Sequence, residues 1–412
     1  LAELFDLEGP GAPQDLGLLC ELMSWEAGDR AKPFLGTPQQ KKSRLFELLY
    51  AQLRRSASIE PRLIVFEDVH WADATSLELL DGLVRQVATQ AILVVITHRP
   101  EFEPPWPDAA NLCRMTLDRL DRQAGAQIVA RVAGGRTLPP ELLEDILART
   151  DGVPLYLEEL TSAVLESGIL REAAVGFELR RPLSAMTVPM SLNASLLARL
   201  DRLAPVKSIA QIGAAIGREF GYALLSEVAR WPAAQLDDAL AQLVASGLLI
   251  EHAPRGTRTF SFKHALVQEV TYSTLLRARR QPLHALIATA LESRFPETVT
   301  SQPEVLARHL AEAGLDDRAV LAYRQAGQLA LSRSAEIEAA AHLSHALALL
   351  QSLPDGEPRD QLELSLQTLH GLALSAARGY ADTLTIAAFE RARVLVHQVG
   401  AIEGVSSIFN GL

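Results

Sequence analysis

The sequence has few cysteines, few aromatic residues and no long apolar run. Only Cys20 and Cys113 occur among 412 residues, which argues against a disulfide framework or a zinc site and suits a reducing compartment. No apolar segment approaches the roughly 20 residues that a membrane helix needs, and no signal-peptide pattern opens the chain. We therefore expect a cytoplasmic protein without a membrane partner.

Basic residues are also scarce. The 39 Lys and Arg are outnumbered by 50 Asp and Glu, and the formal net charge is −11. This balance argues against a general nucleic-acid-binding surface, because such a surface needs a clustered basic footprint. Aromatic residues make up 5% and hydrophobic residues 48%, dominated by Ala and Leu, which predicts a helix-rich globular protein. The length predicts about two to four domains.

A phosphate-binding loop of the form G-x-x-x-x-G-K-[ST] is absent. The nearest segment, residues 36–43, begins with Gly36 but has Lys41 where the second glycine is required. That glycine gives the backbone a geometry that a side chain obstructs, and no predicted strand precedes the segment. We predict the start of a helix with exposed lysines here rather than a phosphate loop.

The most informative feature that is present is a pair of adjacent acids after a short apolar run. Residues 63–66 are apolar, and Glu67 and Asp68 follow directly. Such a run predicts a fully buried strand of a parallel sheet, and open α/β sheets bind ligands at the carboxyl ends of their strands. The pair thus predicts a Walker B site, in which one acid supports Mg²⁺ through water and the other orients the attacking water. A solvated acidic turn is the alternative.

Four motifs occur in order along the chain: FEDVHWAD at 66–73, THRPEF at 97–102, RTDGVPL at 149–155 and FKHALVQE at 262–269. Together they resemble the signal-transduction ATPases with numerous domains (STAND), specifically the ATPase and TPR half of bacterial class III adenylate cyclases and related regulators. The resemblance implies ATP or ADP with Mg²⁺ as ligands. It also places the Walker A loop upstream of Leu1, so we expect the chain to be a fragment that is inactive alone.

The resemblance suggests roles for the candidate residues. Glu67 supports the metal and Asp68 orients water, and the reverse assignment stays open. Glu67 departs from the family, where Asp is common at this position. Its side chain places the carboxylate one methylene farther from the backbone than that of Asp. Arg99 corresponds to an arginine that reads the γ-phosphate, the alternative being a surface arginine at a strand end. Asp73 is predicted to cap the next helix rather than to act in catalysis.

Two further positions carry implied nucleotide contacts. Gly152 and Pro154 match a G-x-P motif that packs on adenine in the family. By themselves they predict a helix boundary, with Gly152 ending one helix and Pro154 in the first turn of the next. His264 lies where similar winged helices place a nucleotide-sensing histidine, and the alternative is a partly buried core histidine.

Periodicity predicts a multidomain α/β plus α protein. A partial parallel-sheet P-loop ATPase core begins it, with Met115-Thr116-Leu117 as a further short strand and helices from 122 to 165 as a lid. Helical stripes and a hairpin of residues 248–250 and 260–262 then predict a winged-helix domain. The expected boundaries are 1–170 for the ATPase part, 171–189 for a linker, 190–282 for the winged helix and 283–412 for a truncated TPR-like α-solenoid.

Small and large residues alternate at TPR spacing near the carboxyl end of the sequence. Ala339, Leu343 and Ala346 fit the second helix of one repeat, and Phe389 and Ala392 repeat part of the pattern. The cluster of Arg277, Arg279 and Arg280 is predicted to serve packing rather than DNA binding.

The expected function is a nucleotide-operated signalling switch in which ATP or ADP sets the arrangement of sheet, lid and winged helix. A protein partner or inducer is expected at the TPR-like region. The effector domain is expected outside this chain, with a class III cyclase implied by association only. The alternatives are an ATP-dependent transcription regulator of the same class and a degenerate scaffold that does not hydrolyse ATP.

Overall fold

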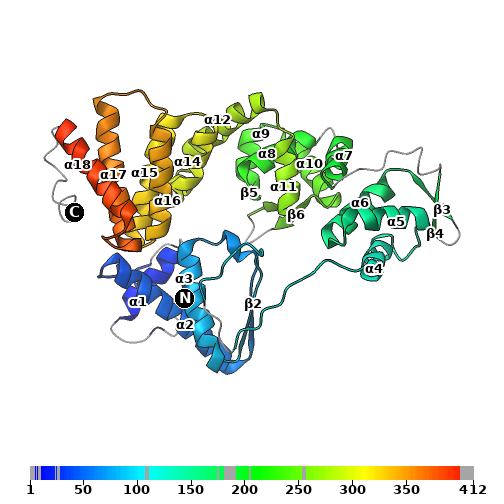
Figure 1. The fold of residues 1–412 in the computed structure, drawn as a ribbon, viewed down its shortest axis with the longest axis horizontal. Coiled ribbons are helices and arrows are strands. Elements are labelled where there is room, and N and C mark those ends of the chain that lie inside the picture. Colours follow the sequence, from blue (N-terminus) through cyan, green and yellow to red (C-terminus); the bar gives the residue numbers. More distant parts are fainter. Residues whose placement is uncertain are drawn as a thin grey trace. The chain divides into compact units, whose positions relative to one another are not determined.

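The computed structural model describes Phe5, Leu7 and residues 11–23, 25, 28–106, 111–173, 176–180, 192–203, 206–252 and 257–399. The chain divides into two compact units. The first comprises Leu1–Cys113, Thr298–Ala311 and Leu315–Leu412, and the second comprises Arg114–Glu297 and Glu312–Gly314. Figure 1 labels most of the helices and strands of both units.

A parallel strand pair forms the sheet of the first unit. Strand β1 (Arg62–Phe66) pairs in parallel with β2 (Ile92–Ile96), in register from Arg62↔Ile92 to Phe66↔Ile96. The connection contains a short turn of helix (Val69–Trp71), helix α3 (Ala74–Gln86) and a second short turn (Val87–Thr89). Parallel strands need such a crossover. The predicted parallel pairing is confirmed.

Only one face of this sheet is covered by the described chain. The covered face packs on helix α2 (Pro38–Ile59) and on α3, and the cluster includes Tyr50, Leu53, Ile64, Phe66, Leu77, Leu80, Leu83, Val94 and Ile96. The other face is exposed: Leu63 by 65%, Val65 by 51%, Leu93 by 64% and Val95 by 41%. The expectation of a fully buried strand is therefore wrong here. Successive side chains point to opposite faces, and the described residues provide helices for one face.

Residues 36–43 start a helix. Thr37 caps α2 with its side chain, which accepts from the Gln40 amide at 3.2 Å, while the Thr37 amide donates to Gln40 Oε1 at 2.9 Å. This reciprocal capping box confirms the predicted helix start. The expectation of exposed lysines is wrong for Lys42, which is only 8% exposed. Helix α1 (Ala12–Leu22) packs on α2 through Leu18, Leu19 and Leu48.

The second unit begins with three helices, as predicted for residues 122–165. Helices α4 (Arg122–Val132), α5 (Pro140–Thr150) and α6 (Pro154–Glu166) share one apolar core. Met115 and Leu117 are strongly exposed and form no strand, so that prediction is wrong. No strand among the described residues pairs with them, and an unpaired segment has no ladder of hydrogen bonds to hold it.

The expected linker contains ordered structure. Strand β3 (Leu170–Ala173) pairs with β4 (Gly176–Leu179) in an antiparallel hairpin, which corrects the prediction of an irregular segment from residue 171. The pattern missed these strands because each is only four residues long. Residues 181–189 of the expected linker lie outside the described residues.

The predicted helical stripes and hairpin of the second unit are confirmed. Its helices are α7 (Leu192–Arg202), α8 (Lys207–Ile216), α9 (Tyr222–Ala229), α10 (Ala233–Ala245), α11 (Ala265–Ser273) and α12 (Arg277–Arg294). Strands β6 (Leu249–His252) and β7 (Thr259–Phe262) form the hairpin, whose turn at 253–256 lies outside the described residues. A third strand, β5 (Glu219–Gly221), joins the other edge of β7 and was not predicted.

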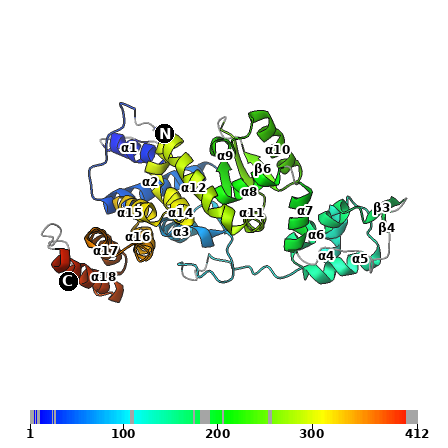
Figure 2. The ribbon, with the colours of Figure 1, turned by 90° about the horizontal axis from the view of Figure 1, so that it is seen from above.

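Consecutive helices after α12 make up most of the remainder of the first unit. Helices α13 (Pro296–Ser301) and α14 (Pro303–Glu312) are followed by α15 (Asp316–Ser332), α16 (Glu336–Leu350), α17 (Glu357–Arg378) and α18 (Thr383–Val399). Helices α15 to α18, here called the repeat region, each pack on the next, and Figure 2 shows their order. All five residues of the predicted repeat pattern are fully buried: Ala339, Leu343, Ala346, Phe389 and Ala392.

Candidate functional site

The predicted acids lie at the carboxyl end of β1. Glu67 is exposed, on the same side of the strand as Leu63 and Val65. Asp68 adopts the left-handed conformation, with φ 56° and ψ 42°. This conformation costs a residue other than glycine about 1–3 kcal/mol, so it persists only where the surroundings enforce it, and such residues gather at functional sites.

Thr97, the residue after β2, holds the acidic loop in this conformation. Its Oγ1 accepts from the Asp68 amide at 2.9 Å, and its carbonyl oxygen accepts from the Val69 amide at 3.0 Å. Its own amide donates to the Phe66 carbonyl at 2.9 Å. The residue at the end of β2 therefore fixes the backbone that carries the acids at the end of β1.

Arg99 lies at the same edge of the sheet as Glu67 and Asp68. Its guanidinium carbon is 5.5 Å from the centroid of the Trp71 ring, a cation–π distance. The His70 ring is 4.8 Å from that of Trp71 at an angle of 50°. Sequence reasoning assigned no role to Trp71, although it lies in the motif that follows the acids. The structure places the Arg99 guanidinium over its ring.

His70 is a second residue without a predicted role. Both of its ring nitrogens are buried and have no hydrogen-bond partner among the described residues. Buried polar atoms normally find partners. The two ring nitrogens of His70, in the loop that carries Asp68, are thus available to hydrogen-bond a group outside the described chain.

The two acids could provide part of the ligand set of a magnesium ion whose remaining ligands are water and phosphate oxygens. In the described part of the chain no group of three or more His, Cys, Asp and Glu side chains is arranged for a metal. Mg²⁺ keeps several waters and is commonly bound through one or two carboxylates together with substrate phosphates. Glu67 and Asp68 provide two carboxylates of this kind.

Asp73 caps helix α3. Its Oδ1 accepts from the Ser76 amide at 2.7 Å, and its Oδ2 accepts from the Ser76 hydroxyl at 2.9 Å. An N-cap acid of this type satisfies an amide that has no partner within the helix. The prediction that Asp73 caps this helix is confirmed.

Gly152 and Pro154 form the predicted helix boundary in the second unit. Helix α5 is capped by Asp151 at φ 49°, Gly152 follows at φ 69°, and Pro154 is the first residue of α6. The Gly152 carbonyl accepts from the Leu120 amide at 2.9 Å, and a Cβ added at Gly152 would lie 2.3 Å from the Leu120 carbonyl oxygen. The backbone alone therefore requires glycine here.

His264 directly precedes helix α11 and is half-buried. Burial lowers its pKa, and Lys263 and Arg218 lower it further, whereas Glu159 and Glu158 oppose the shift. The ring is therefore neutral at pH 7, and its Nε2 has no hydrogen-bond partner among the described residues. Because Glu158 and Glu159 belong to α6, His264 lies close to the helix that Pro154 starts.

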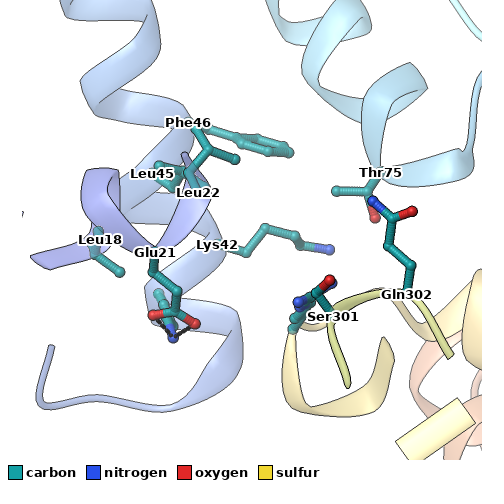
Figure 3. Close-up of a pocket in the computed structure, with 11 residues that line it drawn as sticks. Leu18, Glu21, Leu22, Lys42, Leu45, Phe46, Thr75, Ser301 and Gln302 are labelled. Atoms are coloured by element: carbon teal, nitrogen blue, oxygen red, sulfur yellow. Dashed lines mark hydrogen bonds and ion pairs between the residues drawn. The ribbon is translucent and has the colours of Figure 1, made fainter. Parts of the chain in front are cut away.

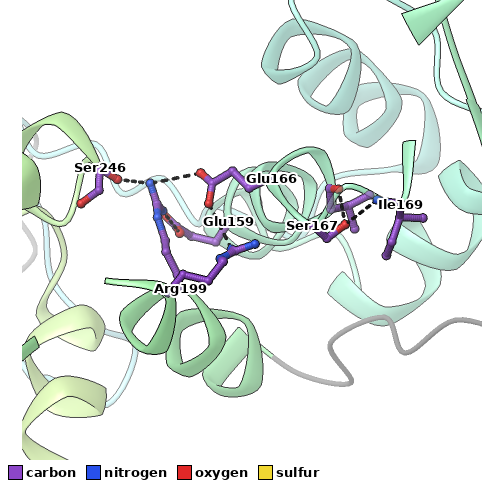
Figure 4. Close-up of polar contacts among 8 residues, drawn as sticks. Glu159, Glu166, Ser167, Ile169, Arg199 and Ser246 are labelled. Atoms are coloured by element: carbon purple, nitrogen blue, oxygen red, sulfur yellow. Dashed lines mark hydrogen bonds and ion pairs between the residues drawn. The ribbon is translucent and has the colours of Figure 1, made fainter. Parts of the chain in front are cut away.

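An ion pair that sequence reasoning missed joins α6 to α7. Arg199 donates to Glu159 at 2.9 Å, lies 3.7 Å from Glu166 and donates to the carbonyl oxygen of Ser246, as Figure 4 shows. The Arg199 and Glu159 side chains are only 13% and 7% exposed. The sequence offers one signal: each charge stands beside a leucine of its helix that the core buries, Leu160 or Leu200.

The six predicted site residues fall into two sets, one in each unit. Glu67, Asp68 and Arg99 follow the carboxyl ends of β1 and β2 in the first unit, and Gly152, Pro154 and His264 lie along or beside α6 in the second.

Comparison with known proteins identifies the region around the acids. Residues 12–96 match the family described as the AAA ATPase domain. An uncharacterized protein of Rhizobium meliloti (strain 1021) is 32% identical over 356 residues, which make up 83% of this chain and 34% of that protein. The chain thus spans about a third of the length of this relative.

A solved structure also resembles the chain. It is a signal transduction ATPase with numerous domains, with a tetratricopeptide repeat sensor, from Pyrococcus horikoshii. The similarity covers 89% of this chain and 54% of that chain, with 13% identity and a TM-score of 0.42.

Within the described residues, no helix is both long and apolar enough to cross a bilayer.

Proposed function

We propose that this chain belongs to a signal-transduction ATPase, in which bound ATP or ADP with Mg²⁺ sets the arrangement of the domains. One observation carries the proposal: Thr97 fixes Glu67 and Asp68 at the carboxyl end of a parallel strand, within residues similar to an AAA ATPase domain. Glu67 would support the metal, and Asp68 would orient the water that attacks the γ-phosphate.

The remaining site residues are proposed to contact the nucleotide. Arg99, held over Trp71, offers a fixed cation for the γ-phosphate. The backbone at Gly152 and Pro154 would pack on the adenine. His264 has a neutral ring with an unused buried nitrogen, which can donate to a diphosphate oxygen. We describe α7 to α11 with their three-stranded sheet as a winged helix on the basis of the same resemblance.

Replacing either acid tests the proposed hydrolysis. In the full-length protein, Glu67→Gln and Asp68→Asn should each slow ATP turnover about tenfold or more, equivalent to about 1.4 kcal/mol of activation free energy. Replacing the acid that supports the metal should also raise the Mg²⁺ concentration needed for half-maximal turnover, whereas replacing the acid that orients water should not. This difference distinguishes the two assignments.

Glu60→Gln is the matched control for this test. Glu60 is an exposed acid at the opposite, amino end of β1, where it pairs with Arg62 at 2.7 Å. Its replacement should leave turnover unchanged. Equal, undiminished turnover in all three variants would show that Glu67 and Asp68 form only a solvated turn.

Replacing the histidine tests the proposed resting state. If His264 contacts the bound diphosphate, His264→Ala should weaken ADP binding about tenfold, the effect of losing a contact of about 1.4 kcal/mol. Isothermal titration of the full-length protein with ADP measures this. His252→Ala is the control, because His252 lies on β6 and bonds Ser261 Oγ at 2.8 Å. Unchanged ADP affinity with a lower melting temperature in His264→Ala would identify a core histidine instead.

The output of the switch is proposed from resemblance. The repeat region would act as a TPR-like sensor for a protein partner or inducer, and a class III cyclase would be the effector. Cyclic AMP formation by the full-length protein distinguishes this from a transcription regulator or an inactive scaffold.

DNA binding is not proposed. Arg280 donates to the carbonyl of Leu275 at 3.0 Å and stacks on Tyr272 at 4.7 Å, as expected of a packing residue.

A further inference from the structure

Lys42 makes an unusual contact within the first unit. Its side chain is 7% exposed, and its ammonium group donates to the carbonyl oxygen of Ser334 at 2.7 Å, in the turn between α15 and α16. The same group pairs with Glu336 of α16 at 3.6 Å and with Glu78 of α3 at 3.0 Å. Figure 3 shows the Lys42 side chain extending away from α2 toward Thr75, Ser301 and Gln302. A single buried cation thus joins α2, α3 and the repeat region.

The turn that accepts from Lys42 has a strained backbone. Ser334 has φ 53° and is 3% exposed. A serine in the left-handed region costs free energy that the surrounding contacts must supply. The hydrogen bond from Lys42 to the carbonyl of this same residue is one such contact.

A second contact joins α16 to the start of α3. Glu338 Oε1 accepts from the Thr75 amide at 2.8 Å. Thr75 is the second residue of α3, and its amide has no partner within that helix because the first four amides of an α-helix have none. The helix begins directly after the loop that carries Asp68 and Asp73. The first turn of α16 therefore contacts the segment that leads out of the acidic loop.

These contacts are polar rather than apolar. The apolar core of the repeat region and that of β1, β2, α2 and α3 share no residue. Pockets of about 340 and 450 Å³ flank Lys42. A contact that depends on a few hydrogen bonds can be exchanged for hydrogen bonds to another partner.

We propose that Lys42, Ser334, Glu336 and Glu338 form a releasable latch between the repeat region and the start of α3, the helix that follows the acidic loop. While it is closed, the repeat region holds the start of α3; when a partner engages the repeat region, the latch opens and α3 is released. The inference deepens the proposed switch by naming the contact that would transmit it. It can fail independently, because its test measures the contact and not nucleotide turnover.

Hydrogen exchange resolved to single amides tests the latch in the full chain. Glu338→Ala should speed exchange of the Thr75 amide at least tenfold. The Ser76 amide, bonded to Asp73 within the same turn, should stay unchanged and serves as the internal reference. Lys42→Met and Glu336→Gln should also speed exchange at Thr75, although neither side chain contacts that amide, because opening is cooperative.

Lys41→Met is the matched control for Lys42→Met. Lys41 is the adjacent lysine, and it pairs with Glu21 of α1 at 2.6 Å. Its replacement should leave Thr75 exchange as in the wild type. The latch is overturned if Thr75 exchanges as slowly in both Lys42→Met and Glu336→Gln as in the wild type. Glu336→Gln keeps the test valid should Lys42→Met fail to fold, because Glu336 is a partly exposed residue in the first turn of α16.

Discussion

Arg199→Ala should destabilise the second unit by about 3–5 kcal/mol. The variant removes the guanidinium that lies 2.9 Å from the Glu159 carboxylate, and that carboxylate is almost fully buried. Removing one partner of a buried pair leaves the other charge without the interaction that offsets its desolvation. Urea-dependent hydrogen exchange of peptides from α6 and α7 measures the loss.

Arg202→Ala is the matched control, one turn along the same helix. Arg202 pairs with Glu166 at 3.1 Å, and both side chains are about 40% exposed. Exposed pairs contribute up to about 1 kcal/mol. Equal costs for the two variants would show that Arg199 is solvated in solution. If the buried pair serves α6–α7 packing alone, the double variant Glu159→Leu, Arg199→Met should recover most of the lost stability, because apolar replacements of a buried pair are often tolerated.

Gly152→Ala should destabilise the second unit by about 3 kcal/mol. The left-handed backbone at φ 69° costs an alanine about 1–2 kcal/mol. In addition, its Cβ would lie 2.3 Å from the Leu120 carbonyl oxygen, so the Leu120–Gly152 hydrogen bond must break or shift at a further cost of about 1–3 kcal/mol. Hydrogen exchange of α5 and α6 in urea measures the combined effect.

Gly168→Ala separates backbone strain from steric conflict. Gly168 has φ 73°, but an added Cβ would meet nothing within 4 Å. Its replacement should therefore cost only about 1–2 kcal/mol. If Gly152→Ala costs no more than Gly168→Ala, the close approach of Leu120 is relaxed in solution. Nucleotide affinity of the full-length forms of both variants then shows whether Gly152 also contacts adenine.

Local patterns in the sequence predicted much of the secondary structure. The apolar runs before Glu67 and Thr97 predicted β1 and β2, and helical spacing predicted the helices of both units, because burying an apolar stripe needs a 3.6-residue or two-residue period. Asp73 and Pro154 marked helix starts, since capping depends on residues within one turn. The adjacent acids at a strand end likewise predicted a site from neighbouring residues alone.

The sequence by itself thus determined most of the helices, the strands β1, β2, β6 and β7, and where the acids stand along the chain. Only the tertiary structure decided that Thr97 holds Asp68 in a left-handed conformation, that Trp71 lies under Arg99, and that Arg199 and Lys42 bury their charges. It also left one face of β1 and β2 exposed, where the pattern predicted burial on both. The physical reason is the range of the interactions. Periodicity and capping act within a few residues, whereas ion pairs and sheet faces depend on segments that meet across tens to hundreds of positions, as Lys42 and Ser334 do.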